Sequence, residues 1–514
     1  MTPAQPTTLE EAQLIIHAHC TTIDQMSQDM VKLQGQVAWL TRQMFGRKSE
    51  KLTDDEQAGL FEHLHDDAAA AQDEAKEQTQ TITYERRSTN RGKRQPIPDH
   101  LPRRDVIHDL PEDQKANYKR IGEVVSEQLE YEAASIYVIR HIRYKYAPAD
   151  EMMLDASGES LGVIVAQKPA TAINKGIAGP GLLAQIAISK FGDHRPLYRL
   201  ERIFKRHGVD LARSSMCRWM QDLAALCKPL LTSMKQQILC SHVIQSDDTP
   251  VKQQDHESRS GKTKTCRFWS YVGDKAHPYV VYAYTLDRSR AGPEKWFRDE
   301  QGEPNFRGPL QCDAYVGYDR LFEPLWQMIH IGCWAHVRRK FHDARLSFPG
   351  PCHEALALIG QLYQVERRCK DLDANARRQM RQAEARPLLD RFWSWCDECR
   401  RESLPKSALG LAIQYALNLR PALERHIEDG ALDIDNNACE RSLRGIAIGR
   451  RNWLFTGSEA GGTAAAAMFT LIGSANLNGV DPYAYLRDIF TRLPTTPLNQ
   501  LDQFLPDRWA AQTT

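Results

Sequence analysis

Aromatic and β-branched residues cluster in the middle of the chain and predict a β-sheet. Three runs lie at 242–251, 267–272 and 279–284, and Gly273-Asp274-Lys275 between the last two has the composition of a hairpin turn. Shorter apolar runs at 308–312 and 328–331 predict two more strands, before a helix that begins near Cys333. Because the strands come first and the helices follow, we expect one mixed sheet covered by helices, which is a mixed α/β fold.

Apolar residues near the N-terminus recur every seven positions from Ile16 to Met44, with a companion series from His19 to Leu40. This heptad pattern predicts a coiled-coil helix. We expect the helix to join two copies of the chain into a homo-oligomer. The same pattern also fits a helix that packs on the body of its own chain.

Two further helices are expected around a turn, at 197–207 and 214–223, with Ser214 as the cap of the second. A helix-turn-helix DNA-binding unit has this pattern, and so does a simple helical hairpin. Residues 351–425 are almost entirely helix-forming and predict a helical insertion. Near the C-terminus, helices are expected at 461–473 and 482–490, the second starting at Asp481 before Pro482.

Three acidic residues lie where these elements end or begin. Asp247 is expected at the end of the first strand, which Pro250 should terminate, and Asp313 follows the fourth strand. Glu440 falls in the first turn of a helix that Asp435 or the following Asn is expected to cap. Hard divalent cations prefer oxygen ligands, so the sequence predicts a site for Mg²⁺ or Mn²⁺ over a phosphodiester.

The residue next to Asp247 is also acidic, so the sequence leaves a choice between Asp247 and Asp248. Neighbouring side chains on a strand face opposite ways, and only one of the two can join the site. We choose Asp247.

Several blocks of the chain resemble transposases of insertion-sequence family sixty-six. The blocks are 246–251, 312–315, 333–341, 435–444, 449–458 and 478–486. The resemblance implies a ribonuclease-H-like core with a helical insertion, in which Asp247, Asp313 and Glu440 are the catalytic and metal-binding DDE triad. Where the family usually has Asp-Glu-Thr, this chain has Asp-Asp-Thr at 247–249.

An enzyme of this family is expected to cleave the ends of an insertion element and to join them to target DNA. Accessory proteins from the same element are plausible partners. Two other functions remain open. One is a ribonuclease-H-like nuclease or resolvase without strand transfer, and the other is a catalytically inactive protein that binds element ends.

The formal net charge is only +1, so affinity for DNA must come from local basic patches. One stretch of seven basic residues, from Arg86 to Arg104, predicts a basic arm or a solvated linker. The candidate DNA-binding residues are Arg47, Lys48, Arg213, Arg218, Trp334, Arg338, Arg441, Arg444, Arg450 and Arg451. The resemblance implies that Trp334 and Arg338 position an end nucleotide by stacking and charge; packing of Trp334 in a core is the alternative.

The cysteines bear on metal binding and on location. Twelve cysteines without a signal sequence predict a reducing compartment. No long apolar run occurs, so we expect no membrane span. We therefore expect a cytoplasmic bacterial protein that joins the nucleoid when bound to DNA.

Relatives carry a zinc module with two Cys-x-x-Cys pairs, but no cysteine lies between Cys20 and Cys217 here, so zinc is not expected. Cys333 and His336 lie one turn apart near the expected active site, and a zinc role for this pair is a minor alternative.

These patterns divide the chain into eight expected segments. They are a coiled-coil dimerisation helix (1–52), a flexible linker with a basic arm (53–104), a degenerate zinc-finger-like β module (105–165), a helix-turn-helix-like segment (166–235), the first part of the catalytic core (236–346), a helical insertion (347–428), the third-acid helix with its basic segment (429–470) and a helical cap (471–514).

Overall fold

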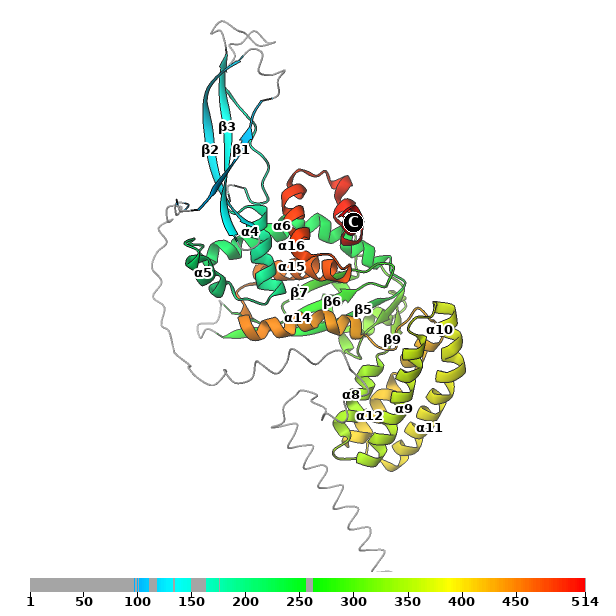
Figure 1. The fold of residues 1–514 in the computed structure, drawn as a ribbon. Coiled ribbons are helices and arrows are strands. Elements are labelled where there is room, and N and C mark those ends of the chain that lie inside the picture. Colours follow the sequence, from blue (N-terminus) through cyan, green and yellow to red (C-terminus); the bar gives the residue numbers. More distant parts are fainter. Residues whose placement is uncertain are drawn as a thin grey trace, which may run out of the picture.

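The computed structural model describes residues 97, 99, 101–110, 118–132, 135–148, 163–174, 176–255 and 262–513. A mixed sheet lies at the centre of this part of the chain (Figure 1). Its strands run in the order β7-β6-β5-β8-β9, with β10 pairing beside β5. Their bounds are β5 (Ile244–Gln254), β6 (Thr263–Val272), β7 (Val280–Thr285), β8 (Pro309–Gln311), β9 (Ile329–Ile331) and β10 (Phe455–Thr456).

The first three strands of this sheet are antiparallel, and β8 and β9 run parallel to β5. The predicted mixed sheet and its hairpin between β6 and β7 are therefore confirmed.

Strand β5 continues past Pro250, and the prediction that this proline ends the strand is wrong. On one side β5 pairs with β6 along its length, including Pro250 with Arg267. On the other side β8 reaches only 244–245 and β10 only 252–253. Pro250 therefore lies beside an open edge, where its missing N–H removes no ladder bond. Asp247 is consequently inside β5, just past the end of its pairing with β8, and not at a strand end.

Helices cover the sheet and its outer edge. The main ones are α6 (Arg213–Leu239), α14 (Asn437–Trp453) and α15 (Glu459–Leu477). Helix α15 lies along β7, where the backbone N–H groups of Val280 and Tyr282 donate to Ser474 Oγ at 3.1 Å and Thr470 Oγ1 at 3.0 Å. These hydroxyls satisfy the open edge of β7, which would otherwise be free to pair with another strand. The predicted C-terminal helices are confirmed, and Asp481 caps α16 (Pro482–Arg492).

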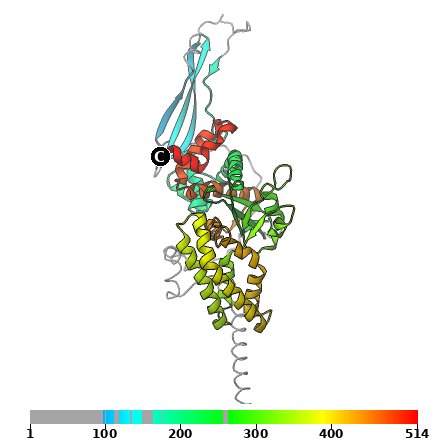
Figure 2. The same cartoon turned by 90° about the vertical axis from the view of Figure 1, so that its right-hand side faces the viewer.

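A separate helical body lies between β9 and α14 in the chain (Figures 1 and 2). Its helices are α8 (Trp334–Ala344), α9 (Pro349–Cys369), α10 (Ala374–Met380), α11 (Arg386–Glu402), α12 (Ala408–Asn418) and α13 (Arg420–Glu424), with a π turn at Arg381–Ala385 and a 3-10 turn at Arg425–Ile427. This body has its own hydrophobic core, which already includes Trp334, Val337 and Phe341 of α8. The helical body thus begins at α8, before the predicted boundary at residue 347, because these residues pack in its core and not with the sheet.

A second sheet projects away from the body (Figures 1 and 2). It consists of β1 (Arg103–His108), β2 (Tyr118–Glu132), β3 (Ser135–Pro148) and β4 (Ile164–Val165). Strands β2 and β3 form a long antiparallel pair, and β1 runs parallel to β3. The end of the expected basic arm is thus a strand, and Arg103 Nε lies 2.9 Å from Glu127 Oε1.

The helical pair before the central sheet differs from its prediction. Helix α5 (Leu197–Arg206) is followed by α6, which begins at Arg213 and continues through Pro229. Ser214 lies inside the first turn, and the N-cap residue is Ala212, so Ser214 is not the cap. Helix α6 buries a long apolar face in the central core, while Arg213 and Arg218 remain exposed.

The remaining helical segments are short. They are α4 (Pro180–Ala187), α7 (Ala291–Trp296), α17 (Pro506–Thr513), a π turn at Ile188–Gly192 and 3-10 turns at Val316–Phe322, Leu493–Thr495 and Leu498–Phe504. Among the described residues no helix combines the length and apolar character needed to cross a membrane. The expected coiled coil, the linker up to residue 96, and the candidates Arg47 and Lys48 lie outside the described residues.

Candidate active site

Two neighbouring acids on β5 have different surroundings. The carboxylate of Asp248 is 1% exposed and is held by Arg267 Nη1 at 3.0 Å and Arg288 Nη2 at 2.8 Å. Among the residues that the structure describes, no arginine pairs with Asp247 in this way; its Oδ1 accepts a hydrogen bond from the Asp248 backbone N–H at 2.7 Å. Burial, followed by the negative charge of Asp313 and then that of Glu440, raises the pKa of Asp247 to about 8. Asp248 therefore has its counter-ions in the fold, whereas Asp247 does not.

Asp313 lies two residues beyond the end of β8. Its Oδ1 accepts a hydrogen bond from the Tyr315 backbone N–H at 3.1 Å, and its Oδ2 lies 3.8 Å from Arg288 Nη2. Burial raises the pKa of Asp313, while the Tyr315 N–H, Arg288 and Lys340 act in the opposite direction. Arg288 thus lies between Asp248 and Asp313.

Glu440 lies in the first turn of α14, as predicted. The helix begins after Asn436, whose side chain makes no cap hydrogen bond, while Asp435 Oδ1 accepts from the Asn437 N–H at 3.1 Å. A buried glutamine of β5 fixes this helix start: Gln245 Oε1 accepts from the Cys439 N–H at 3.2 Å. This hydrogen bond joins the start of the helix that carries Glu440 to the strand that carries Asp247.

The residues around Asp247 and Glu440 line one open cavity of about 290 Å³. Its lining residues are Asp247, Asp248, Thr249, His336, Arg339, Glu440, Leu443, Arg444 and Ala447. Asp313 is not among them, yet it is close enough for its charge to raise the pKa of Asp247. The three predicted acids therefore lie close enough for the charges of Asp313 and Glu440 to raise the pKa of Asp247, and Asp247 and Glu440 line the cavity.

Other side chains also lie near these acids, and of these Arg339 and Arg288 were not predicted from the sequence. Arg339 Nη2 lies 3.7 Å from Glu440 Oε2, and His336 Nε2 lies 3.6 Å from Glu440 Oε1. Burial, with help from Arg339 and Lys340, lowers the pKa of His336 to about 4, so the imidazole is neutral near pH 7. Both residues lie in the family-like block at 333–341, which could have indicated them. No sequence pattern indicated Arg288.

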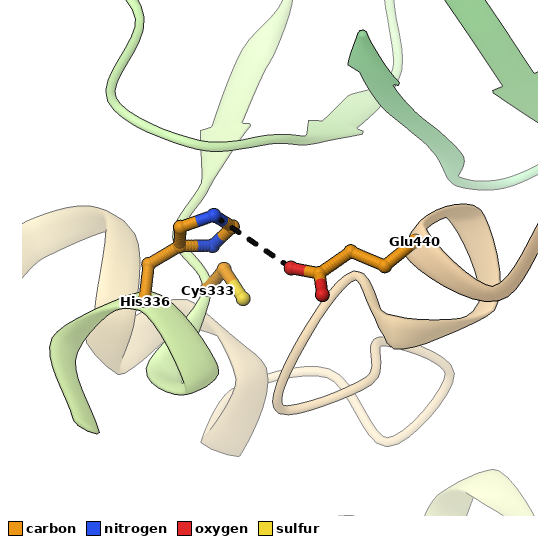
Figure 3. A group of neighbouring side chains, drawn as sticks. All are labelled: Cys333, His336 and Glu440. Carbon is orange, nitrogen blue, oxygen red and sulfur yellow. Dashed lines mark ion pairs between the residues drawn. The ribbon is translucent and has the colours of Figure 1, made fainter. Parts of the chain in front are cut away.

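His336 and Glu440 also belong to a cluster with Cys333 (Figure 3). The potential ligand atoms of these three side chains lie within 4.8 Å of one another. Zinc binding by Cys333 and His336 was only the minor alternative predicted from the sequence, and Glu440 was not predicted as a third member of the cluster.

Trp334 is a core residue, and its expected stacking on an end nucleotide is wrong for this structure. The side chain is 0% exposed, and its ring packs against Phe392 and Trp393. Its indole N–H donates to the Leu423 carbonyl at 3.1 Å. Because both faces of the ring are buried and its N–H is already hydrogen-bonded, Trp334 cannot stack on a nucleotide or donate to one in this structure.

Truncation of Trp334 should therefore affect folding before it affects DNA. We expect Trp334→Ala to lower the free energy of unfolding by about 3–5 kcal/mol, because it leaves a cavity in the helical core. Urea denaturation followed by circular dichroism measures this loss. Trp334→Phe, which keeps most of the volume, should cost less and should retain DNA binding. A folded Trp334→Phe protein that has lost binding to element ends would contradict the core role.

The arginines after Glu440 have unequal surroundings. Arg441, Arg444 and Arg451 are exposed. Arg450 is half-buried and donates to Thr249 Oγ1 at 3.0 Å, so it ties α14 to β5. Arg338 is also half-buried.

Models of known protein families match most of this chain, including the segments that carry the three acids. The family model described as "Transposase IS66 family" matches residues 175–464, more than half of the chain, including all three acids. The chain belongs to the IS66 transposase family. The model of the IS66 C-terminal element matches residues 470–506, and a model described as "Transposase C of IS166 homeodomain" matches residues 32–106. Membership supports a transposase role and a nucleic-acid-processing enzyme.

The IS66-family zinc-finger model matches residues 111–147, which include most of β2 and β3. The expectation that the protein holds no zinc is therefore not supported by the comparison. The family generally uses divalent metal ions, in line with the predicted Mg²⁺ or Mn²⁺.

Three proteins from Sinorhizobium fredii are similar to this chain over most of their length. The chain is 32% identical to the uncharacterized protein y4jD, over 95% of this chain and 96% of the relative. It is 30% identical to y4hP, over 93% and 89%, and 33% identical to y4qI, over 91% and 87%. All three are described as uncharacterized.

Proposed function

We propose that this protein cleaves the ends of an insertion element and joins them to target DNA, with Asp247, Asp313 and Glu440 as its catalytic triad. The observation that carries the proposal is the meeting of a β5 acid and an α14 acid on one cavity wall, with the acid after β8 close enough to act on Asp247. The strand order of the sheet, three antiparallel strands followed by two parallel ones, supports a ribonuclease-H-like core.

The residues present suit divalent cations. Three carboxylates close to one another repel, and the raised pKa of Asp247 reflects this repulsion together with burial. Asp247, Asp313 and Glu440 would hold the metal ions. Bound Mg²⁺ or Mn²⁺ would supply activation of the attacking oxygen and stabilisation of the leaving oxygen.

The other residues of the cavity position DNA. Arg339 and Arg444 line the cavity beside the acids and would hold phosphate oxygens next to the scissile bond. In the first step water attacks the phosphodiester at the element end, a new P–O bond forms, and the bond to the leaving oxygen breaks to free a terminal hydroxyl. In the second step that hydroxyl attacks a target phosphodiester, and the target strand supplies the leaving oxygen. No covalent bond to the protein forms.

We propose that further basic residues outside the cavity also contact DNA. Exposed Arg441 and Arg451 extend the basic side of α14, and exposed Arg213 and Arg218 lie on α6. Arg338, Arg450, Arg47 and Lys48 remain proposed contacts from the sequence. The heptad helix would join two chains, and accessory proteins of the element would be further partners. For the β1–β3 module we propose that no four-thiolate zinc site forms, because no cysteine lies between Cys20 and Cys217.

A donor-plus-target assay tests the function. Purified protein is incubated with an end-bearing duplex, a labelled target duplex and Mg²⁺, and the expected result is joined donor–target product. Cleaved ends without joined product would favour the nuclease or resolvase. Binding of ends without cleavage, unaffected by Mg²⁺ or by Asp313→Asn, would favour the inactive end-binding protein.

Arg444 is the exposed arginine whose loss tests phosphate contact most simply. We expect Arg444→Ala to weaken duplex binding similarly for all sequences and to reduce the slope of log K against log salt by about 1, because one phosphate contact disappears. Fluorescence anisotropy at several salt concentrations measures this. The matched control is Arg400→Ala, which removes an exposed arginine of α11 and should leave the slope unchanged. Equal slopes for both variants would exclude a phosphate contact at Arg444.

A further inference from the structure

A thiol, an imidazole and a carboxylate from two different helices point toward one another beside the cavity (Figure 3). Cys333 is the N-cap residue of α8, His336 lies in the first turn of the same helix, and Glu440 comes from the first turn of α14. Their potential ligand atoms all lie within 4.8 Å of one another. In the part of the chain that the structure describes, this is the group of three such side chains that meets that distance.

The spacing of this cluster suits a small tetrahedral ion. Bonds of about 2.0–2.2 Å to nitrogen or oxygen and about 2.3 Å to sulfur place tetrahedral nitrogen and oxygen ligands roughly 3.3–3.5 Å apart, with sulfur roughly 3.5–3.7 Å from either. His336 Nε2 and Glu440 Oε1 are 3.6 Å apart, slightly beyond the nitrogen–oxygen range. This separation is too long for a direct hydrogen bond, so the two side chains are close without satisfying each other.

Two polar groups of the cluster, the imidazole of His336 and the thiol of Cys333, are not placed as ordinary packing residues would be. The Nδ1 atom of His336 is buried and has no hydrogen-bond partner among the described residues. A metal ion bound at Nδ1 would satisfy this atom. Cys333 is 1% exposed, and burial raises the pKa of its thiol to about 12, while the backbone N–H groups of Asn436 and His336 act in the opposite direction. Metal binding must therefore displace the thiol proton.

We propose that Cys333, His336 and Glu440 form a binding site for a thiophilic divalent cation of the Zn²⁺ class. Sulfur and imidazole ligands select zinc-class ions over Mg²⁺, which prefers oxygen. Binding replaces the S–H bond of Cys333 with a sulfur–metal bond and releases the proton to solvent. Three protein ligands leave a fourth position for solvent or a substrate oxygen, because His336 and Glu440 both line the cavity.

This site does not depend on a catalytic role for Glu440, but it has a consequence for one. A zinc-class ion held by Cys333 and His336 takes Glu440 as its third ligand. Zinc-class ions and Mg²⁺ therefore compete for the same carboxylate, although they differ in their other ligands.

Titration of the full-length protein with Co²⁺ tests the site without an activity measurement. Co²⁺ occupies zinc sites, and a sulfur-to-cobalt charge-transfer absorption band reports a thiolate ligand. We expect this band to saturate at about one Co²⁺ per chain, to disappear when Zn²⁺ is added, and to persist in a large excess of Mg²⁺. Absence of the band in folded protein would overturn the proposal.

Three variants assign the ligands. Cys333→Ser should abolish the band, and His336→Gln should weaken Co²⁺ binding by at least about tenfold. The matched control is Cys352→Ser, which removes another buried thiol near a helix start and should keep the band. Circular dichroism checks that each variant is folded. A band that survives in Cys333→Ser assigns the metal to another thiol and overturns the proposal; if Cys333→Ser does not fold, unweakened binding by His336→Gln overturns it instead.

Discussion

Asp247→Asn is expected to reduce cleavage of an end-bearing duplex by about 10³-fold or more, because it removes a charged metal ligand from the proposed triad. The fold should tolerate the change. Asparagine has the shape of a protonated carboxyl group, and burial together with the charge of Asp313 raises the pKa of Asp247, which favours its neutral form. Cleavage with Mg²⁺ and thermal unfolding of the same preparation measure the two effects.

The matched control for Asp247→Asn is Asp255→Asn, one residue past the end of β5. It removes a carboxylate close in sequence and should leave cleavage within a few-fold of the parent protein. Full cleavage by a folded Asp247→Asn protein would show that the choice of Asp247 is wrong.

Asp248→Ala is expected to act on stability first, in contrast to its neighbour. It leaves Arg267 and Arg288 without the carboxylate that both contact, and loss of one partner of a buried ion pair costs about 3–5 kcal/mol. Because these arginines are 21% and 37% exposed, water offsets part of that cost, and we expect about 2–4 kcal/mol. Urea denaturation measures the loss.

Two further variants show whether the effect of Asp248→Ala comes from its burial. Asp105→Ala breaks an exposed pair with Arg140 at 3.2 Å and should cost less than about 1 kcal/mol. Asp248→Glu keeps the negative charge and should recover most of the stability. If Asp248→Ala unfolds like the parent protein but no longer cleaves, Asp248 would replace Asp247 as the candidate ligand.

Local patterns in the sequence were sufficient for the strands and for the placement of Glu440. Runs of aromatic and β-branched residues marked β6 and β7, and the position of Glu440 within a turn of a helix start followed from the residues before it. The continuation of β5 past Pro250 could not be predicted, because it depends on which neighbouring strands leave an edge open.

Contacts between distant segments were the part that sequence could not supply. Arg288 follows β7, and only the folding of the sheet brings it to Asp248 and Asp313. Trp334 lies in a basic block that suggested DNA, but its environment is set by α11 and α13 much later in the chain. The cluster of Cys333, His336 and Glu440 likewise joins two helices separated by the whole helical insertion.

Iron-mediated cleavage of the protein backbone tests most directly whether the three acids share metal ions. Fe²⁺ in place of Mg²⁺, with ascorbate and peroxide, generates radicals that cut the chain close to the bound ion. We expect cuts near Asp247, Asp313 and Glu440. Mg²⁺ should suppress them together, and Asp247→Asn should weaken them at all three places. Mg²⁺-sensitive cuts at only one of these segments, or at none of them, would contradict a shared metal site.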